Sequence, residues 1–247
     1  MGIIRDWIYE MGDTFLDLIF PSGIYCINCD APIYNKPYGL CDSCREKIKW
    51  IKGRTCGKCG KPLENWYFPD ACRDCVNEKH LFTKGFSCAV YDDSVKKIII
   101  DLKYNGKGYY AKHIAEMMYQ KLNEQNLQID FIIPVPLHPK KQKERGYNQS
   151  YLLAKHLAHL SQTEINDRIL IRNRYTQSQN KLSLINRQKN IKNAFTIINN
   201  GYICNKNILL VDDVYTTGNT VDACCKEMMR YGVKNIYIIT PVIGKNE

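Results

Sequence analysis

The sequence contains no hydrophobic run of the ~18 to 20 residues that a transmembrane helix needs. It also has no succession of charged, apolar and small residues of the kind that forms a secretory signal peptide. The first absence excludes an integral membrane segment. The second argues against secretion, and therefore against a framework of disulfide bonds. We expect a cytoplasmic protein.

Residues 1–20 instead predict an amphipathic helix. Apolar side chains recur at helical spacing on one broad face, and the polar face carries acidic residues where a membrane-binding helix would carry Lys or Arg. We expect the apolar face to pack on the rest of the protein, with peripheral contact at the inner membrane face as the alternative. The apolar positions are Ile4, Trp7, Ile8, Met11, Phe15, Leu18 and Ile19.

Acidic residues are scarce between His138 and Lys192, where three of them accompany 12 Lys and Arg residues. The chain has a formal net charge of +10, and this segment carries most of the excess. A concentrated basic segment suggests a polyanionic partner, either nucleic acid or pyrophosphate, although a solvated surface can have the same composition. The candidates for contacts with nucleic acid are Lys140, Lys141, Lys143 and Arg145.

Cysteine is abundant: the chain has 12, and eight of them form four C-x-x-C pairs at nearly even intervals. A C-x-x-C turn puts two thiolates on one metal ion, so two pairs together make a four-cysteine zinc site. The short segment around one such four-cysteine site, called a zinc ribbon, cannot bury a useful hydrophobic core. Bound zinc can instead supply ~10 to 16 kcal/mol of folding energy. We therefore predict two structural Zn²⁺ ions, with these ligands: Cys26, Cys29, Cys41, Cys44, Cys56, Cys59, Cys72 and Cys75.

The predicted double zinc ribbon spans residues 21–84. Its simplest assembly joins consecutive C-x-x-C pairs. A cross-braced assembly, in which the first pair joins the third and the second joins the fourth, is an alternative that the sequence leaves open. As an independent module, the ribbon of Cys56 is expected to unfold on losing its zinc while the domain after it stays folded.

The stretch from Asn207 to Thr220 reads NILLVDDVYTTGNT. Its continuous apolar run, Ile208–Val211, predicts a strand buried on both faces. Two carboxylates follow where this strand leaves the sheet, and a turn rich in Thr and Gly then leads into a helix. Such a turn aims backbone N–H groups at a phosphate, and the carboxylates can accept hydrogen bonds from two sugar hydroxyls. The stretch resembles the motif with which type I phosphoribosyltransferases bind 5-phosphoribosyl 1-pyrophosphate (PRPP).

Strands alternate with helices over residues 85–247, which predicts a mostly parallel α/β sheet flanked by helices. Ligands of such sheets bind beyond the carboxyl ends of the strands, where loops 136–149 and 212–220 both emerge. The predicted strands are residues 85–91, 131–135, 169–171, 194–198, 208–211 and 236–240, and the predicted helices are residues 95–102, 111–122, 151–160 and 182–192.

Together these features resemble the ComF family, phosphoribosyltransferase-like proteins associated with bacterial DNA uptake and natural transformation. The motif at residues 208–220 alone indicates only the phosphoribosyltransferase superfamily. The double ribbon joined to it, with Arg-Gly-Tyr-Asn-Gln at residues 145–149 between them, is specific to the family. Other matching positions are Phe20-Pro21, Leu102-Lys103-Tyr104, Val135-Pro136-Leu137, Thr176, Gln179, Leu182, Arg187, Asn190 and Phe195.

The resemblance implies a type I phosphoribosyltransferase-like domain that binds PRPP with Mg²⁺. Asp212 and Asp213 would hold the ribose hydroxyls, residues 216–220 would cradle the 5′-phosphate, and residues 136–138 would contact pyrophosphate through Mg²⁺ and water. Lys103 could neutralise a phosphate or simply complement the dipole of its helix. The candidate PRPP contacts are Lys103, Pro136, Leu137, His138, Arg145, Arg187, Asp212, Asp213, Thr216, Thr217, Gly218, Asn219 and Thr220.

The implied function is a PRPP-binding and single-stranded-DNA-binding protein of DNA uptake, with other uptake proteins as partners. An active phosphoribosyltransferase and a PRPP-responsive regulator of transcription are the alternatives. Thr216 stands where purine-salvage members of the superfamily carry an acid that acts as a base, and no insertion over the site is recognisable. The sequence therefore supports no nucleobase pocket and assigns no catalytic residue.

Overall fold

The computed structural model describes residues 23–63, 70–174, 194–198 and 202–245. The chain forms two compact units, one up to Lys47 and one from Ile48 onward. The boundary falls between the two groups of four cysteines. In the first unit, the described elements are η1 (Pro37–Gly39) and α2 (Asp42–Lys47). The predicted helices at residues 1–20 and 182–192, and with the latter Arg187, lie outside the described residues.

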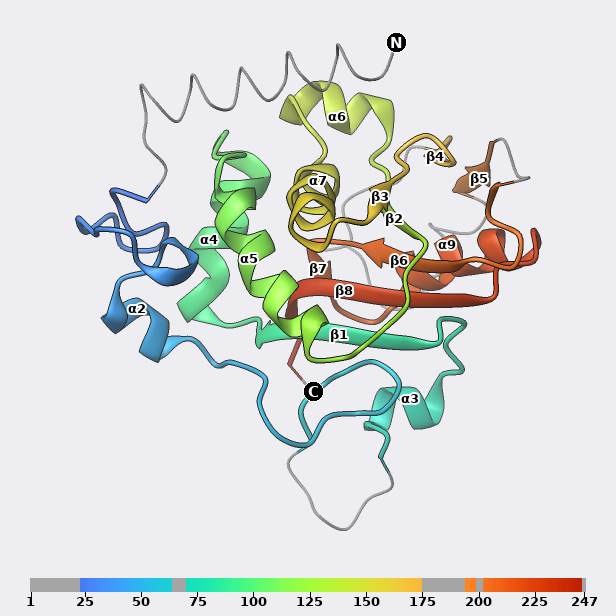
Figure 1. Ribbon diagram of the computed structural model, residues 1–247, viewed down its shortest axis with the longest axis horizontal. Coiled ribbons are helices and arrows are strands. Elements are labelled where there is room, and N and C mark those ends of the chain that lie inside the picture. Colours follow the sequence, from blue (N-terminus) through green and yellow to red (C-terminus); the bar gives the residue numbers. More distant parts are fainter. Residues whose placement is uncertain (1–22, 64–69, 175–193, 199–201, 246–247) are drawn as a thin grey trace. The chain divides into compact units, whose positions relative to one another are not determined.

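A parallel sheet forms the centre of the second unit, as the alternating pattern predicts (Figure 1). Its strand order is β1–β8–β6–β2–β3, and β7 pairs with the end of β8. Residues Ile208 to Val211 are completely buried, because β6 lies inside the sheet with both faces covered. The strands are β1 (Lys84–Val90), β2 (Phe131–Pro134), β3 (Glu164–Ile165), β6 (Asn207–Val211), β7 (Val214–Tyr215) and β8 (Asn235–Ile243).

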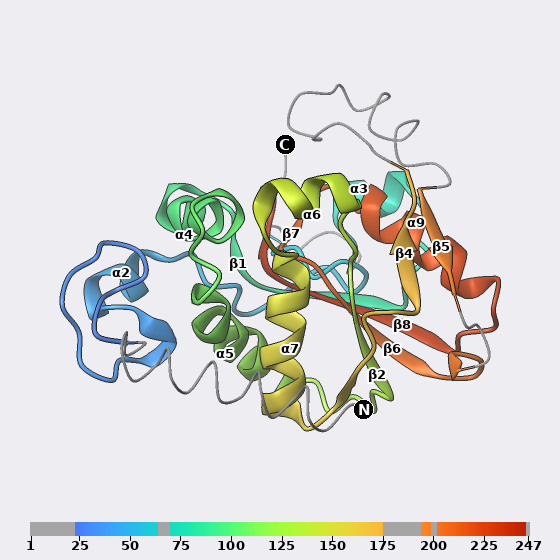
Figure 2. The same cartoon turned by 90° about the horizontal axis from the view of Figure 1, so that it is seen from above.

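Helices cover one face of this sheet. α5 (Tyr110–Asn123) packs against β1 and β8, and α7 (Gln149–Ser161) packs against β2 and β6. The two helices lie side by side (Figures 1 and 2). α4 (Asp93–Tyr104) is capped by Asp92, whose carboxylate accepts a hydrogen bond from the Ser94 N–H.

The other face is covered by α9 (Asn219–Met229) together with the second group of cysteines. Alternate residues of the sheet, Ile208 and Leu210 among them, share one hydrophobic core with α9 and with Cys56, Cys59 and Cys72. A parallel sheet must be covered on both faces. The second cysteine module, which includes the short helix α3 (Arg73–Asn77), therefore takes the place that a further helix would fill.

Two predicted strands belong to a separate sheet. Within the described residues, β4 (Leu170–Arg172) and β5 (Phe195–Ile197) form a two-stranded antiparallel sheet of their own. β5 packs beside α9, and its Phe195 lies in the core that α9 shares with the main sheet. The sequence predicted both strands but placed them in the parallel sheet. An apolar pattern indicates that a segment forms a strand, but it does not show which other strand it pairs with.

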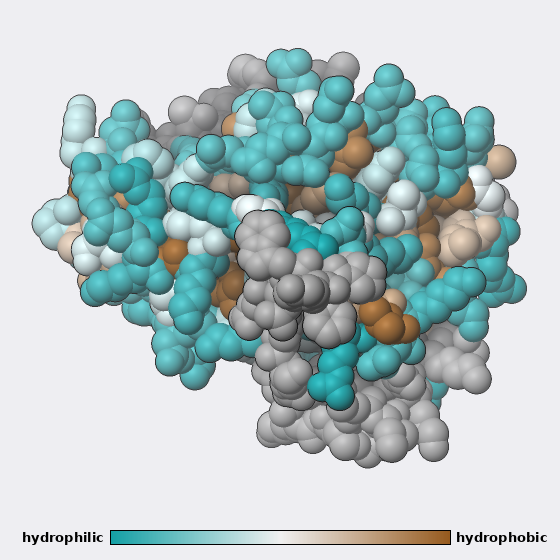
Figure 3. All heavy atoms as spheres, turned by 90° about the horizontal axis from the view of Figure 1, so that it is seen from below, coloured by the Kyte–Doolittle hydropathy of each residue, from teal (hydrophilic) through white to brown (hydrophobic). Residues whose placement is uncertain are grey.

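Among the described residues, no helix is long and apolar enough to cross a membrane. Hydrophilic side chains predominate on the face of the molecule that Figure 3 presents, and the hydrophobic ones form small scattered patches.

Candidate functional site

The candidate site lies at the carboxyl edge of β2 and β6. The two strands are neighbours, with Pro134 opposite Val211, and the Val135 N–H donates to the Val211 carbonyl at 2.8 Å. The chain after β2 and the chain after β6 therefore leave the sheet side by side. This brings residues 136–138 next to the acidic pair, as the sequence predicted.

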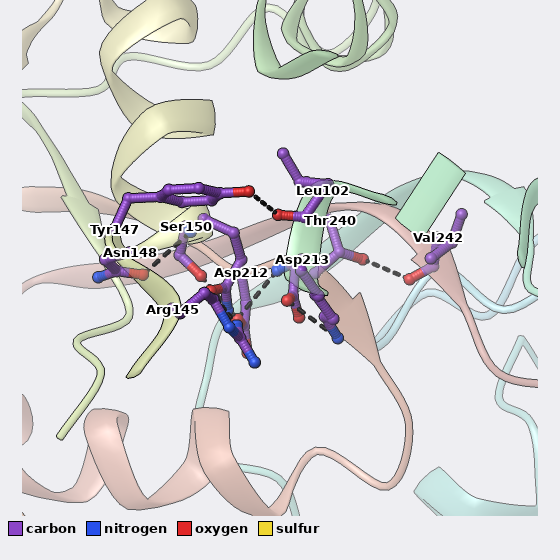
Figure 4. Close-up of polar contacts among 11 residues, drawn as sticks. Leu102, Arg145, Tyr147, Asn148, Ser150, Asp212, Asp213, Thr240 and Val242 are labelled. Carbon is purple, nitrogen blue, oxygen red and sulfur yellow. Dashed lines mark hydrogen bonds and ion pairs between the residues drawn. The ribbon is translucent and has the colours of Figure 1, made fainter. Parts of the chain in front are cut away.

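Asp212 is buried directly after β6, and its hydrogen bonds within the described residues come from a hydroxyl and a backbone N–H. Its Oδ1 accepts from the Ser150 hydroxyl at 3.0 Å and from the Asp213 N–H at 2.9 Å (Figure 4). Burial raises the pKa of Asp212 to about 7, and the negative charge of Asp213 contributes to the same shift. Ser150 was not predicted as a site residue, since only the fold brings α7 beside β6.

Asp213 faces the end of α4. Lys103 Nζ lies 2.9 Å from Asp213 Oδ2, and both side chains are largely buried. Burial lowers the pKa of Lys103, but the charge and hydrogen bond of Asp213 outweigh it and the net pKa is raised. The sequence left two roles open for Lys103, a contact with a phosphate and a favourable interaction with the dipole of its own helix. In the structure it neutralises one carboxylate of the acidic pair.

The predicted phosphate loop joins β7 to α9. Gly218 is the N-cap of α9 and has φ +79°, a backbone conformation that favours glycine. Thr217 Oγ1 is buried and makes no hydrogen bond within the described residues. A buried polar atom without a partner is costly, and here it stands at the N-terminus of an 11-residue helix. The arrangement suits an anion.

The predicted cluster of cations forms a helix, not a loop. α6 (Pro139–Arg145) begins with Pro139, and the Lys140 N–H donates to Nδ1 of the capping residue His138 at 3.2 Å. Gly146, with φ +86°, ends the helix. Helical spacing divides the four cations into two pairs. Lys140 and Lys143 are exposed, whereas Lys141 and Arg145 are half-buried.

Arg172 of β4 joins this cluster, which the sequence did not predict. Burial lowers the pKa of Lys141, and the positive charges of Arg172 and Arg145 lower it further. The charge of Asp212 also acts on Arg172. Lys141, Arg145 and Arg172 thus form one group of cations, and Arg172 is the member on which the charge of Asp212 acts. The one sequence signal for a role of Arg172 was its position in the basic segment. The separate sheet that carries Arg172 was not predicted.

The stretch Arg-Gly-Tyr-Asn-Gln holds these parts together. The Tyr147 hydroxyl donates to the Leu102 carbonyl at 2.7 Å, and Asn148 Nδ2 donates to the Val135 carbonyl at 3.0 Å. Asn148 Oδ1 also caps α7 by accepting from the Ser150 N–H at 3.1 Å. Arg145 donates to Gln149, and its guanidinium lies 4.8 Å from the centre of the Tyr104 ring. The stretch therefore connects the ends of α4, β2 and α7.

The eight predicted zinc ligands form two groups of four consecutive cysteines. In each group the Sγ atoms all lie within 4.8 Å of one another, with 3.6 Å between Cys29 and Cys41 and 3.5 Å between Cys59 and Cys72. Tetrahedral zinc with bonds of ~2.3 Å needs sulfurs ~3.8 Å apart. Both groups suit structural zinc. The consecutive pairing is confirmed, and the cross-braced alternative is excluded.

The purified protein is expected to contain about two zinc ions per chain, because sites with four thiolates are closed and structural. Elemental analysis measures the stoichiometry, and titration of free thiols before and after chelation shows whether the same cysteines hold the metal. Zinc-free protein whose cysteines resist thiol reagents until it is reduced would overturn this expectation.

Comparison with known proteins agrees with both parts of the chain. The Double zinc ribbon domain family matches residues 15–76, and the Phosphoribosyl transferase domain family matches residues 107–247, more than half of the chain. Competence protein F of Haemophilus influenzae is 30% identical over 86% of this chain and 94% of its own length. The chain belongs to the ComF family.

Other relatives of this ComF protein carry related names. DNA utilization protein YhgH of Escherichia coli K12 is 27% identical over 86% of this chain and 94% of its own length. Competence protein ComFC of Bacillus subtilis is 28% identical over 78% and 79%, respectively. These names describe competence and DNA utilization in the relatives. They agree with the resemblance found in the sequence.

Proposed function

We propose that this ComF protein binds PRPP, with Mg²⁺, at the carboxyl edge of β2 and β6. The observation that carries the proposal is the joint placement of the acidic pair and the loop at residues 216–220. Asp212 and Asp213 offer acceptors for two ribose hydroxyls. The Thr217 hydroxyl, which has no hydrogen-bond partner in the described part of the chain, and the N-terminus of α9 suit the 5′-phosphate. Two carboxylates held together inside a protein repel each other, which a ligand that uses both would offset.

The charges around the site support a pyrophosphate group beside the ribose. The charge of Asp212 acts on Arg172, and the charges of Arg172 and Arg145 act on Lys141. Residues 136–138 lead directly into α6, which carries Lys141 and Arg145. Oxygen ligands on PRPP and the acidic pair are of the kind that Mg²⁺ prefers. When bound, Mg²⁺ would neutralise charge on the pyrophosphate. Lys103 would then be able to exchange Asp213 for a phosphate oxygen.

Calorimetry with PRPP in the presence of Mg²⁺ tests this proposal. Ribose 5-phosphate and inorganic pyrophosphate, measured separately, probe the two halves of the site. We expect PRPP to bind more tightly than either fragment, and removal of Mg²⁺ to weaken PRPP and pyrophosphate more than ribose 5-phosphate. Equal, weak binding of all three would count against a PRPP site.

We further propose that single-stranded DNA is a partner of this protein, whose relatives are named for competence and DNA utilization. The exposed pair Lys140 and Lys143 on α6 supports this, because both lysines lie on the solvent side of a helix that emerges at the mouth of the site. Phosphates neutralised by Lys or Arg release counterions, so such binding is salt-dependent. A cytoplasmic location, a peripheral position at the inner membrane face and contacts with other uptake proteins stay predictions.

The two cation pairs of α6 should separate DNA binding from PRPP binding. Replacing Lys140 and Lys143 with Ala is expected to lower the slope of log K against log salt for single-stranded DNA by roughly 1 to 2. PRPP affinity should change little. Replacing Lys141 and Arg145 should weaken PRPP instead, since these half-buried cations form one group with Arg172, on which the charge of Asp212 acts.

A double replacement of Lys52 and Lys226 with Ala removes the same charge from exposed positions on other elements. Fluorescence anisotropy over a range of salt concentrations gives the slope for each protein. An equal change of slope in this control and in the α6 variant would show that only net charge matters. An unchanged slope in both would place the DNA contacts elsewhere.

Phosphoribosyl transfer to an acceptor not yet identified is a second candidate function. The small β4–β5 sheet favours it, since Arg172 extends from that sheet toward the acidic pair. Departure of pyrophosphate needs charge stabilisation by cations more than it needs a base, so Thr216 does not prevent it. Pyrophosphate release from PRPP, with and without single-stranded DNA, tests this function. Release above the rate of spontaneous hydrolysis would establish transfer or hydrolysis.

A further inference from the structure

His80 lies between the second cysteine group and the loop at residues 216–220. It follows the last zinc ligand, Cys75, and is buried. Its Nδ1 lies 2.7 Å from Asp222 Oδ2, and the Leu81 N–H donates to Asp222 Oδ1 at 2.8 Å. Both oxygens of a carboxylate in the first turn of α9 are thus held by one segment of the ribbon.

The other side of the His80 ring faces the loop itself. His80 Nε2 lies 3.4 Å from the Tyr215 hydroxyl. A Cβ atom added at Gly218 would lie 2.6 Å from that hydroxyl and 2.9 Å from His80 Cε1. The turn that precedes α9 therefore rests directly on these two side chains. No other residue fits at Gly218 unless they move.

The same segment continues into the second cysteine module. The Phe82 ring is completely buried and stacks on His80, with 5.2 Å between the ring centres. Lys58, inside the Cys56-x-x-Cys59 turn, donates a hydrogen bond from its ammonium group to the Phe82 carbonyl. Phe82 and Tyr215 also share the hydrophobic core of the cysteine module. A continuous set of packed and hydrogen-bonded side chains thus connects the zinc ligands with the loop.

We propose that His80 and Asp222 are positioning residues for the 5′-phosphate of the ligand, and that the second zinc ribbon is the support from which they act. His80 fixes Tyr215 on one side and Asp222 on the other, so it holds the turn at Gly218 and the first turn of α9 in one arrangement. The backbone N–H groups that would face the phosphate are then ordered before the ligand binds. The inference rests on the proposed PRPP site.

Preorganisation of this kind acts on affinity, because an unsupported loop must be ordered when the ligand arrives. It also acts selectively. Ligands that carry the 5′-phosphate, PRPP and ribose 5-phosphate, use the supported loop. Inorganic pyrophosphate uses the other half of the site, where α6 and residues 136–138 lie. A residue that only stabilised the fold would not distinguish these ligands.

Calorimetry on the full-length, zinc-loaded protein tests the proposal with four variants. His80→Leu removes both ring nitrogens, and His80→Asn can keep a polar group near the place of Nδ1. Tyr215→Phe removes one hydroxyl and should fold in any case. His113→Leu is the matched control, because His113 is another buried histidine, on α5 at the opposite face of the sheet.

His80→Leu is expected to weaken PRPP and ribose 5-phosphate on the order of tenfold while pyrophosphate binding stays the same. His80→Asn should recover part of the loss, Tyr215→Phe should show a smaller loss of the same selectivity, and His113→Leu should show none. If the wild-type protein binds neither PRPP nor ribose 5-phosphate, the proposed site and this inference both fail. If it binds them and the His80 and Tyr215 variants bind them equally well, only the inference is overturned.

Discussion

Replacing both Asp212 and Asp213 with Asn is expected to weaken PRPP binding at least tenfold, which corresponds to about 1.4 kcal/mol. The loss follows from hydrogen bonds between carboxylates and ribose hydroxyls, each worth ~1.5 to 3 kcal/mol when one partner is charged. Inorganic pyrophosphate should bind as well as before or more tightly, because negative charge is removed beside it. Calorimetry with Mg²⁺ measures both ligands.

Asp130→Asn is the matched control for this experiment. Asp130 also lies in an ion pair, with Lys206 at 3.2 Å, but it precedes β2 at the opposite end of the strand. Its loss should leave PRPP affinity unchanged. If the variant lacking both acids bound PRPP as tightly as the wild type, the acidic pair would have no part in ligand binding, and the basic cluster would have to be explained by DNA alone.

The two acids should differ in their effect on the stability of the free protein. The pKa of Asp212 is raised to about 7, so the folded protein holds a proton that the unfolded chain releases near pH 4. Stability is therefore lost as the pH rises from about 4 to about 7. Asp212→Asn removes this loss and should raise the Tm at pH 8 by a few degrees, with little change at pH 4.

Asp213→Asn should lower the Tm at pH 8 instead, because Lys103 would lose the carboxylate that it contacts inside the protein. Thermal unfolding at both pH values separates the two variants. Equal shifts for both acids would contradict the ion pair. From sequence alone, the adjacent carboxylates would only be expected to repel each other. The contact with Lys103 makes the pair asymmetric.

Cys56→Ser is expected to destabilise the whole second unit, whereas Cys29→Ser should leave that unit intact. Each change should remove about one zinc ion of the two. Cys56 lies in the hydrophobic core that covers the second face of the sheet, together with α9. Zinc can contribute ~10 to 16 kcal/mol to a small site, and domains are stable by only ~5 to 15 kcal/mol. The main thermal transition should therefore fall by ~10 °C or more, or disappear.

Cys29 belongs to the first unit, which ends at Lys47, so its loss should unfold only that unit. Circular dichroism during heating, limited proteolysis and zinc analysis on both variants compare the outcomes. The sequence suggested that the ribbon of Cys56 could unfold by itself. An unchanged main transition in Cys56→Ser would restore that view and would show that the sheet does not need the ribbon on its second face.

Local patterns in the sequence determined the helices and strands and most of the candidate binding residues. The apolar run before Asp212 specified a strand buried on both faces, since only such a strand has no polar side. The C-x-x-C spacing specified zinc ligands, because two thiolates three residues apart reach one ion. The turn rich in Thr and Gly specified the approach to a helix N-terminus. Each of these signals is complete within about a dozen residues.

Only the tertiary structure decided which elements meet. β4, which pairs with β5, carries Arg172, on which the charge of Asp212 acts. Lys103 of α4 forms an ion pair with Asp213. The second ribbon covers one face of the sheet. His80 and Asp222 are 142 residues apart in the chain. Periodicity states that a side chain will be buried, but packing of the whole chain selects its neighbours. For that reason the sequence predicted candidate residues for binding zinc and PRPP. It did not predict the residues that hold those side chains in place.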